Sequence, residues 1–349
     1  MALLFTVIKW AAAAVLSVVC CFVYAVIRAF RYEKKYGRQD KQVPHSAPVE
    51  LYTGRFSTDA QKLRCCLIEK GVEFKEHFVD VGCYGRFENL SAKNLQRNPN
   101  GTSPFLVHDG YPVLETEDVV RYIDGHFGER FLFPTSQEDL DQVVKWATRS
   151  SMAPQAGIDP ETQMYTLGAA TRLLSLPVTA STEKYITVWR TLLAILWHPN
   201  PLGEFPKLIL WVSLLFGAEP GVPDPAVVRS SFVACVATFA DVEKALSDGR
   251  RYLVAKKFSY ADIGMAACLH RLEMLGLLDM MLGERHPKLR AYWSCLKARG
   301  SFGPSFQKVE DNPRAQKMEQ VFADFRKALA DKGLEGAFGY LNNVEEEED

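Results

Sequence analysis

The segment from residue 98 to residue 124, NPNGTSPFLVHDGYPVLETEDVVRYID, contains the clearest structural pattern in the chain. Its opening Asn-Pro-Asn-Gly is typical of a turn, and the mostly apolar residues 103–107 that follow predict a strand. An Asp-Gly pair then indicates a hairpin turn, with a partner strand at residues 112–114. The next Glu-Thr pair opens an amphipathic helix that we expect to end at His126.

The preceding residues predict a strand, a helix and a second strand. Residues 49–53 form the first strand, and residues 60–70 carry apolar side chains at helical spacing before a stop at Gly71. The alternating residues 72–81 form the second strand. With a further helix in the variable segment that ends at Leu95, the full order becomes β-α-β-α-β-β-α, an α/β domain that we place at residues 49–130.

These stretches resemble glutathione S-transferases. Residues 51–71, LYTGRFSTDAQKLRCCLIEKG, are similar to the first strand and helix of that superfamily. Residues 98–124 are similar to the second half of its glutathione-binding domain, including the NPxG turn. The resemblance implies a thioredoxin-like N-terminal domain and an all-α C-terminal domain at residues 137–335, with glutathione as substrate or ligand. Within the superfamily, Leu-His-Arg-Leu at 269–272 and the SxxxQKxR spacing from Ser57 are similar to the ganglioside-induced differentiation-associated protein 1 branch.

Ser57 is the candidate catalytic residue. It stands where the first strand ends and the first helix begins, so its hydroxyl can donate to the glutathione sulfur and favour the thiolate. The plainer alternative is a helix-capping serine without a chemical role. The acidic Asp59 nearby would oppose thiolate formation. No cysteine occupies the turn, which argues against cysteine-type thiol transfer.

Four further residues are candidate glutathione contacts. A cis Pro104 leaves the Ser103 backbone free to pair with the cysteinyl backbone of glutathione; the alternative is an edge-strand proline. Glu115 and Thr116 begin a helix, and such helix starts hold the γ-glutamyl end in the family, through backbone N–H groups and the acidic side chain. The alternative is an acidic first turn that complements the helix dipole. The contact for the glycyl carboxylate stays unassigned among Arg55, His77 and Arg97.

The first thirty residues predict a membrane anchor. Residues 10–26 carry no charge, and six basic residues follow between Arg28 and Lys41. A cleaved signal peptide would carry its basic residues first, so we expect a retained signal-anchor, a transmembrane helix at residues 1–30. The positive-inside rule places the main domain in the cytosol. The resemblance to the branch named above implies that the membrane is the mitochondrial outer membrane or the ER. Residues 31–48 are expected to be a polar linker.

The C-terminal part is predicted to be helical. Ser259 and Asp262 form a capping box before an apolar helix, and we assign both a structural role. Residues 154–224 are an insertion that a minimal transferase lacks, and its apolar stretches are shorter than the roughly 20 residues of a spanning helix. Residues 336–349 are an acidic tail.

Composition narrows the class of function. The net charge of -1 over 349 residues excludes a protein that mainly coats nucleic acid. Eight cysteines without a CxxC pair favour a reducing compartment, and no metal site is expected. Two functions remain. One is a membrane-tethered transferase that conjugates glutathione to an apolar electrophile. The other is a non-enzymatic adaptor or sensor with the same fold, as in organelle dynamics. A homodimer is left open.

Overall fold

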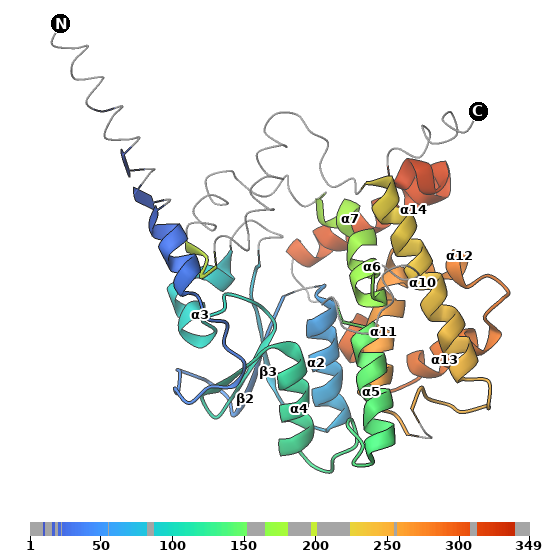
Figure 1. Cartoon of the computed structure of the whole chain (residues 1–349), viewed down its shortest axis with the longest axis horizontal. Helices are drawn as coiled ribbons and strands as arrows, with labels where there is room; N and C mark the ends of the chain where they lie inside the picture. Colours follow the sequence, from blue (N-terminus) through green and yellow to red (C-terminus); the bar gives the residue numbers. More distant parts are fainter. Residues whose placement is uncertain are drawn as a thin grey trace, which may run out of the picture.

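The computed structural model contains both predicted domains. Figure 1 shows α2 (Thr58–Glu69) and α4 (Thr116–His126) between the sheet and the helices of the second domain. The described residues are 10, 16–17, 20–21, 23–54, 56–81, 87–151, 165–180, 197–200, 224–254, 257–307 and 313–338.

The N-terminal domain is built on a five-stranded sheet with the order β1-β5-β4-β2-β3. Strands β2 and β3 are parallel, and the other pairs are antiparallel. The predicted hairpin is confirmed, because Asp109 and Gly110 have positive φ angles of 48° and 84°, as a tight turn between twisted strands requires. The strands are β1 (Gly37–Arg38), β2 (Val49–Thr53), β3 (Lys75–Phe78), β4 (Phe105–His108) and β5 (Tyr111–Leu114).

The helices of this domain cover both faces of the sheet. Helices α2 (Thr58–Glu69) and α4 (Thr116–His126) pack on one face, where they share a core with Leu51 and Leu106. Helix α2 ends as predicted before Gly71, which has a φ of 66°. The short helix α3 (Ala92–Arg97) follows a 3-10 turn and lies over the other face.

Two expectations are corrected by the sheet. The strand predicted at residues 72–81 is confined to β3, because only its four residues pair along β2. Residues 31–48 are not a free linker, since β1 pairs with β5 and the Val43 N–H donates to the Gly110 carbonyl. Without this segment, β5 would leave an edge of unpaired backbone groups.

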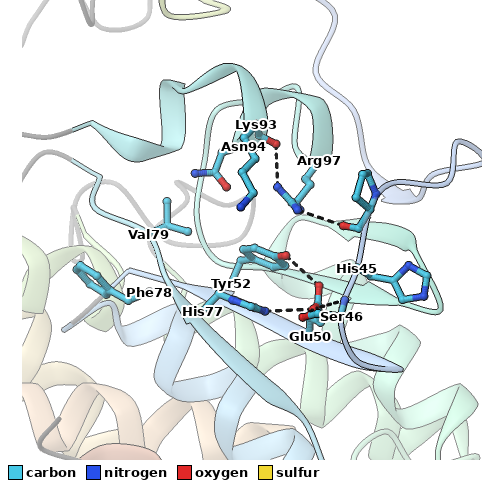
Figure 2. A pocket seen from close by; sticks show the side chains of 11 residues that line it. His45, Ser46, Glu50, Tyr52, His77, Phe78, Val79, Lys93, Asn94 and Arg97 are labelled. Atoms are coloured by element: carbon cyan, nitrogen blue, oxygen red, sulfur yellow. Dashed lines mark hydrogen bonds and ion pairs between the residues drawn. The ribbon is translucent and has the colours of Figure 1, made fainter. Parts of the chain in front are cut away.

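The face of the sheet opposite α2 has a small core of its own. Figure 2 shows Tyr52 on this face, with Lys93, Asn94 and Arg97 of α3 above it. A cavity of about 380 Å³ remains between the sheet and α3. The buried apolar residues here are Val43, Tyr52, Val79, Phe105, Val107 and Leu114.

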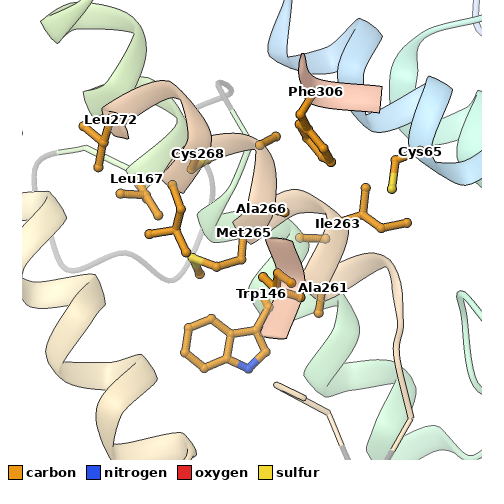
Figure 3. Close-up of a cluster of buried hydrophobic side chains, with 14 of the residues drawn as sticks. Cys65, Trp146, Leu167, Ala261, Ile263, Met265, Ala266, Cys268, Leu272 and Phe306 are labelled. Atoms are coloured by element: carbon orange, nitrogen blue, oxygen red, sulfur yellow. The ribbon is translucent and has the colours of Figure 1, made fainter. Parts of the chain in front are cut away.

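The second domain is helical, as predicted, and α11 is its centre. Residues 260–272 of α11 are all buried. Figure 3 shows Met265 and Ile263 of this helix among Trp146 of α5, Leu167 of α6 and Phe306. The described helices are α5 (Gln137–Arg149), α6 (Leu167–Leu174), α7 (Leu176–Ala180), α10 (Pro225–Ala245), α11 (Tyr260–Met274), α12 (Leu278–Leu282), α13 (Pro287–Lys297), a short π-helix (Gly303–Gln307) and α14 (Pro313–Phe338).

The predicted capping box at the start of α11 is confirmed. The Asp262 carboxylate accepts from the Ser259 N–H at 2.9 Å and from the Ser259 hydroxyl at 3.2 Å. Its other oxygen accepts from the Leu253 N–H at 2.9 Å and from the Tyr292 hydroxyl at 2.8 Å. Asp262 therefore joins the helix start to the preceding loop and to α13.

Among the described helices, α10 is long and apolar enough to cross a membrane. It packs against α6, α12 and α13, and Cys235 and Phe239 are fully buried, so its composition is explained by the core of the domain. Most of the predicted anchor and of the 154–224 insertion, and the end of the acidic tail, lie outside the described residues.

Four cysteines lie in the core that α2 shares with the helical domain. Cys65 and Cys66 belong to α2, Cys235 to α10 and Cys268 to α11, and all four are free thiols. Burial raises the pKa of Cys65 to about 12 and that of Cys268 to about 11. It also raises the pKa values of Cys66 and Cys235. Cys65 and Cys66 thus pack in the body of α2, away from its first turn.

Replacing Asp262 by alanine should cost at least about 3 kcal/mol of the free energy of unfolding. The Leu253 and Ser259 N–H groups and the Tyr292 hydroxyl would each lose a buried acceptor, at about 1–3 kcal/mol apiece. Asp262→Asn adds a pH test. Burial raises the pKa of Asp262 to about 6, so the folded chain keeps a proton that the unfolded chain has lost.

The free energy contributed by Asp262 therefore falls as pH rises from about 4 to about 6. The stability gap between wild type and Asp262→Asn in urea unfolding should narrow over that interval. Asp279→Asn, on an 87% exposed side chain, serves as the control and should change stability little. A gap that widens with pH would contradict the raised pKa.

Candidate functional site

The predicted site residues meet at one edge of the sheet. Strand β4 runs antiparallel to both β2 and β5. Its beginning therefore lies beside the ends of the other two strands. Ser57 follows β2, Ser103 precedes β4 and Glu115 follows β5, so all three lie at this edge.

Ser57 is the N-cap residue of α2. Its hydroxyl oxygen accepts a hydrogen bond of 3.3 Å from the Ala60 N–H, so the capping role is real. A serine hydroxyl can accept one bond and donate another at the same time. Capping therefore leaves the Ser57 proton available for a sulfur atom beside the positive end of the helix.

Ser103 and Pro104 occupy the position opposite Ser57. Their peptide bond is cis, as predicted. The Ser103 hydroxyl donates to the Tyr52 carbonyl at 3.5 Å. A methyl group on Gly54 would lie 3.9 Å from Ser57 Cβ and 3.7 Å from Ser103 Oγ. The two serines thus flank Gly54, whose lack of a side chain keeps the space between them open.

Glu115 has partners that the sequence did not reveal. Its carboxylate forms an ion pair of 2.7 Å with Lys34 and accepts from the Asn100 amide at 2.9 Å. Its backbone has a φ of 68°, in the left-handed region that non-glycine residues seldom adopt. Thr116 is the first residue of α4, where backbone N–H groups lack acceptors within the helix. The helix start is thus arranged as predicted, but a lysine already pairs with its acidic side chain.

Asn100 attaches the segment before β1 to this helix start. Its side chain accepts from the Lys35 N–H at 2.9 Å and donates to the Lys35 carbonyl at 2.7 Å. Asn100 is 1% exposed, so these bonds are shielded from water. In the sequence, the Asn-Pro-Asn-Gly motif indicates a turn at Asn100. It does not indicate that the turn holds the segment around Lys35.

The charge of Asp59 is balanced by a neighbour. Its carboxylate lies 3.1 Å from the Lys62 ammonium, which also donates to the Ser150 carbonyl at 2.9 Å. The Lys62 side chain is only 2% exposed, so this pair is weakly screened. The expected opposition of Asp59 to a thiolate at Ser57 is therefore largely offset.

The candidates for a glycyl carboxylate do not join this edge. His77 and Arg97 line the cavity between the sheet and α3, on the face opposite α2. Arg55 lies outside the described residues. Over the part of the chain that the structure describes, no group of three or more His, Cys, Asp and Glu side chains is placed to hold a metal ion.

Comparison with known proteins agrees with this architecture. Residues 47–125 match the family model of the glutathione S-transferase N-terminal domain, and residues 225–292 match that of the C-terminal domain. The chain therefore belongs to the glutathione S-transferase superfamily.

Individual relatives cover most of the chain. Glutathione S-transferase TCHQD of Arabidopsis thaliana is 24% identical over 75% of this chain and 89% of its own length. Protein LigF of Sphingobium sp. is 26% identical over 74% of this chain and 93% of its own length. The crystal structure of beta-etherase LigF superposes with a TM-score of 0.57 over 75% of this chain and all of that chain, at 22% identity.

A solved structure that contains glutathione has the same fold as this chain. The theta class glutathione S-transferase of Xanthomonas axonopodis pv. citri, with glutathione bound, matches 76% of this chain and 99% of its own. Its TM-score is 0.51 at 17% identity. These comparisons agree on a thioredoxin-like domain followed by a helical domain.

Replacing Asn100 by alanine should release the segment before β1 from the sheet. The variant loses both bonds to Lys35 and the bond to Glu115. Amide exchange at Lys35 should accelerate by about tenfold or more, because a buried hydrogen bond contributes about 1 kcal/mol and several are lost together. Asn94→Ala, which loses a bond to Glu88 elsewhere in the domain, is the control. Unchanged exchange at Lys35 would show that Asn100 does not hold the segment.

Proposed function

We propose that this chain binds glutathione at the edge of the sheet that carries Ser57, Ser103 and Glu115, and that it conjugates the tripeptide to an apolar electrophile. The observation that carries the proposal is the meeting of these three residues at one edge, with the two serines flanking Gly54. Superfamily structures with glutathione bound support the choice of ligand.

Ser57 is the residue proposed to act on the sulfur. Its hydroxyl, held by the cap of α2, donates to the sulfur and favours the thiolate. The thiolate attacks an electrophilic carbon, a carbon–sulfur bond forms, and the leaving group departs with its electron pair. The thiol proton passes to solvent. The Asp59–Lys62 pair supports this role, since it leaves little net negative charge near the thiolate.

Glu115 is proposed to hold the amino end of the tripeptide. Its carboxylate now pairs with the Lys34 ammonium. The γ-glutamyl ammonium has the same charge and would take this place, while Thr116 at the start of α4 offers its N–H to the carboxylate. Lys34 is 40% exposed, so it can turn into solvent when the ligand arrives.

The same ion pair supports a second candidate function. If Lys34 stays on Glu115, the Glu115 carboxylate is not available to the γ-glutamyl ammonium, and the fold serves as an adaptor or sensor. The resemblance to the ganglioside-induced differentiation-associated protein 1 branch is consistent with that role. Membrane attachment is compatible with the adaptor function as well as with the transferase function.

Membrane attachment through residues 1–30 is part of the proposal. The described residues at the end of this stretch, 23–31, are helical. Phe30, within this helical stretch, is 82% exposed. Two apolar residues that precede the stretch are also exposed, Trp10 at 74% and Leu16 at 64%. Exposed apolar residues on a helix are costly in water and favourable in a bilayer.

Ser57→Ala should lower the rate of conjugation far more than the affinity for glutathione. One hydrogen bond to a charged group contributes about 1.5–3 kcal/mol, which is roughly ten- to a hundredfold in rate. Glu115→Gln should show the opposite pattern, with affinity lost first. Calorimetry with glutathione and a chlorodinitrobenzene rate assay on the full-length chain in detergent measure both quantities.

Ser136→Ala is a matched control for Ser57→Ala. Ser136 caps α5 and accepts from the Asp139 N–H at 3.2 Å, as Ser57 does from Ala60. Both variants should lose a similar 0.5–2 kcal/mol or so of stability, but only Ser57→Ala should lose rate. Equal losses of rate in the two variants would show that Ser57 only caps its helix and has no chemical role. No binding by wild type at millimolar glutathione would favour the adaptor.

The main domain is expected to face the cytosol. Protease added to sealed membranes should digest the chain from its acidic C-terminal end, because the basic residues between Arg28 and Lys41 keep that side of the anchor inside the cell. Detergent should add no further digestion of that end. Protection of the C-terminal end until detergent is added would reverse the proposed orientation.

A further inference from the structure

We propose that the cavity between the sheet and α3 binds a small organic anion, with its acidic group on Arg97 and Lys93. The cavity lies on the face of the sheet opposite α2, and none of Ser57, Ser103 and Glu115 lines it. It is therefore separate from the proposed glutathione site, and the inference does not depend on that site.

Arg97 is a buried cation without a counter-ion among the described residues. Only 7% of the residue is exposed. Its two terminal nitrogens donate to backbone carbonyls, those of Lys93 at 3.0 Å and Pro44 at 3.1 Å. Its Nε is buried and has no hydrogen-bond partner. A buried charge and an unsatisfied donor are both costly, and one bound anion would relieve both.

Among the described residues that line the cavity, Glu50 is the one carboxylate, and it already has partners. Glu50 accepts from the Ser46 N–H at 2.8 Å, from the Ser46 hydroxyl at 2.5 Å and from the Tyr52 hydroxyl at 2.9 Å. His77 Nε2 lies 3.2 Å from it as well. Burial acts to raise the pKa of Glu50, but these hydrogen bonds hold it at about 2. Glu50 therefore stays ionised with partners of its own, and it forms no ion pair with Arg97.

Lys93 supplies a second positive charge. Figure 2 shows its side chain extending from α3 toward Tyr52, beside Arg97. The side walls are apolar where Val79, Phe78 and Pro44 contribute. Among the described residues of the lining, two side chains, Lys93 and Arg97, thus face one carboxylate that already has partners.

These features define the class of ligand. The volume of about 380 Å³ suits a compact molecule. The two cations favour a carboxylate or phosphate group, which would lie between the α3 side chains. The apolar walls favour a ligand whose remaining atoms, apart from the acidic group, carry no charge. Benzoate, a carboxylate on one aromatic ring, matches all three features and is a suitable probe.

The test is calorimetric binding of benzoate to the full-length chain in detergent, with and without changes at the two cations. Wild type should bind benzoate, and Lys93→Met and Arg97→Gln should each weaken binding by about tenfold or more. Benzyl alcohol, the neutral counterpart, should bind at least tenfold more weakly than benzoate. Lys288→Met, on α13 far from the cavity, should leave the affinity unchanged.

Lys93→Met keeps the test decisive even if Arg97→Gln fails to fold. Lys93 is exposed, and its side chain forms no hydrogen bond or ion pair with the residues that the structure describes. No benzoate binding at about 10 mM would overturn the proposal. So would equal binding by wild type and Lys93→Met, or equal binding of benzoate and benzyl alcohol. Displacement of benzoate by glutathione would also overturn the proposal, since the probe would then occupy the proposed glutathione site at the edge of the sheet.

Discussion

Helix α2 is buried on two sides, and this constraint organises the molecule. One side packs on the sheet and the other on α11, so polar residues of α2 must find partners in the second domain. Lys62 donates to the Ser150 carbonyl, and Arg64 donates to the Ser305 carbonyl and pairs with Glu76. These bonds fix the direction of α2 and thereby place its first turn, with Ser57, at the edge between the two domains.

The helix start at Glu115 depends on a different constraint, the pairing of β5 with the chain before it. β1 closes the outer edge of β5 and carries Lys34 to within 2.7 Å of the Glu115 carboxylate. The same stretch continues backward into the helical residues 23–31. The segment at residues 23–38 and the proposed ligand site are thus connected, and the Lys34–Glu115 ion pair lies where the two meet.

Local patterns predicted much of this architecture. The strand at 49–53, the hairpin at Asp109, the cis Pro104 and the capping box at Ser259 each depend on a few consecutive residues, and the structure confirms them. The contacts of Asn100 with Lys35 could not be predicted, because they join residues 65 positions apart through a polar segment without periodicity. The cavity below α3 could not be predicted either, because its lining comes from β2, β3, α3 and the chain before β2. Only the packing of these segments places Arg97 over the ring of Tyr52.

The buried cysteines have a consequence for chemical self-protection. A protein that presents an activated thiol to electrophiles risks alkylation of its own thiols, and only the thiolate reacts readily. With a pKa of about 11, Cys268 is ionised in roughly one molecule in ten thousand at neutral pH, and the fraction for Cys65 is lower still. Close packing around both residues also keeps reagents out. For the proposed transferase, the burial of these four thiols leaves glutathione as the competitive nucleophile, because the thiols would otherwise react with the same electrophiles.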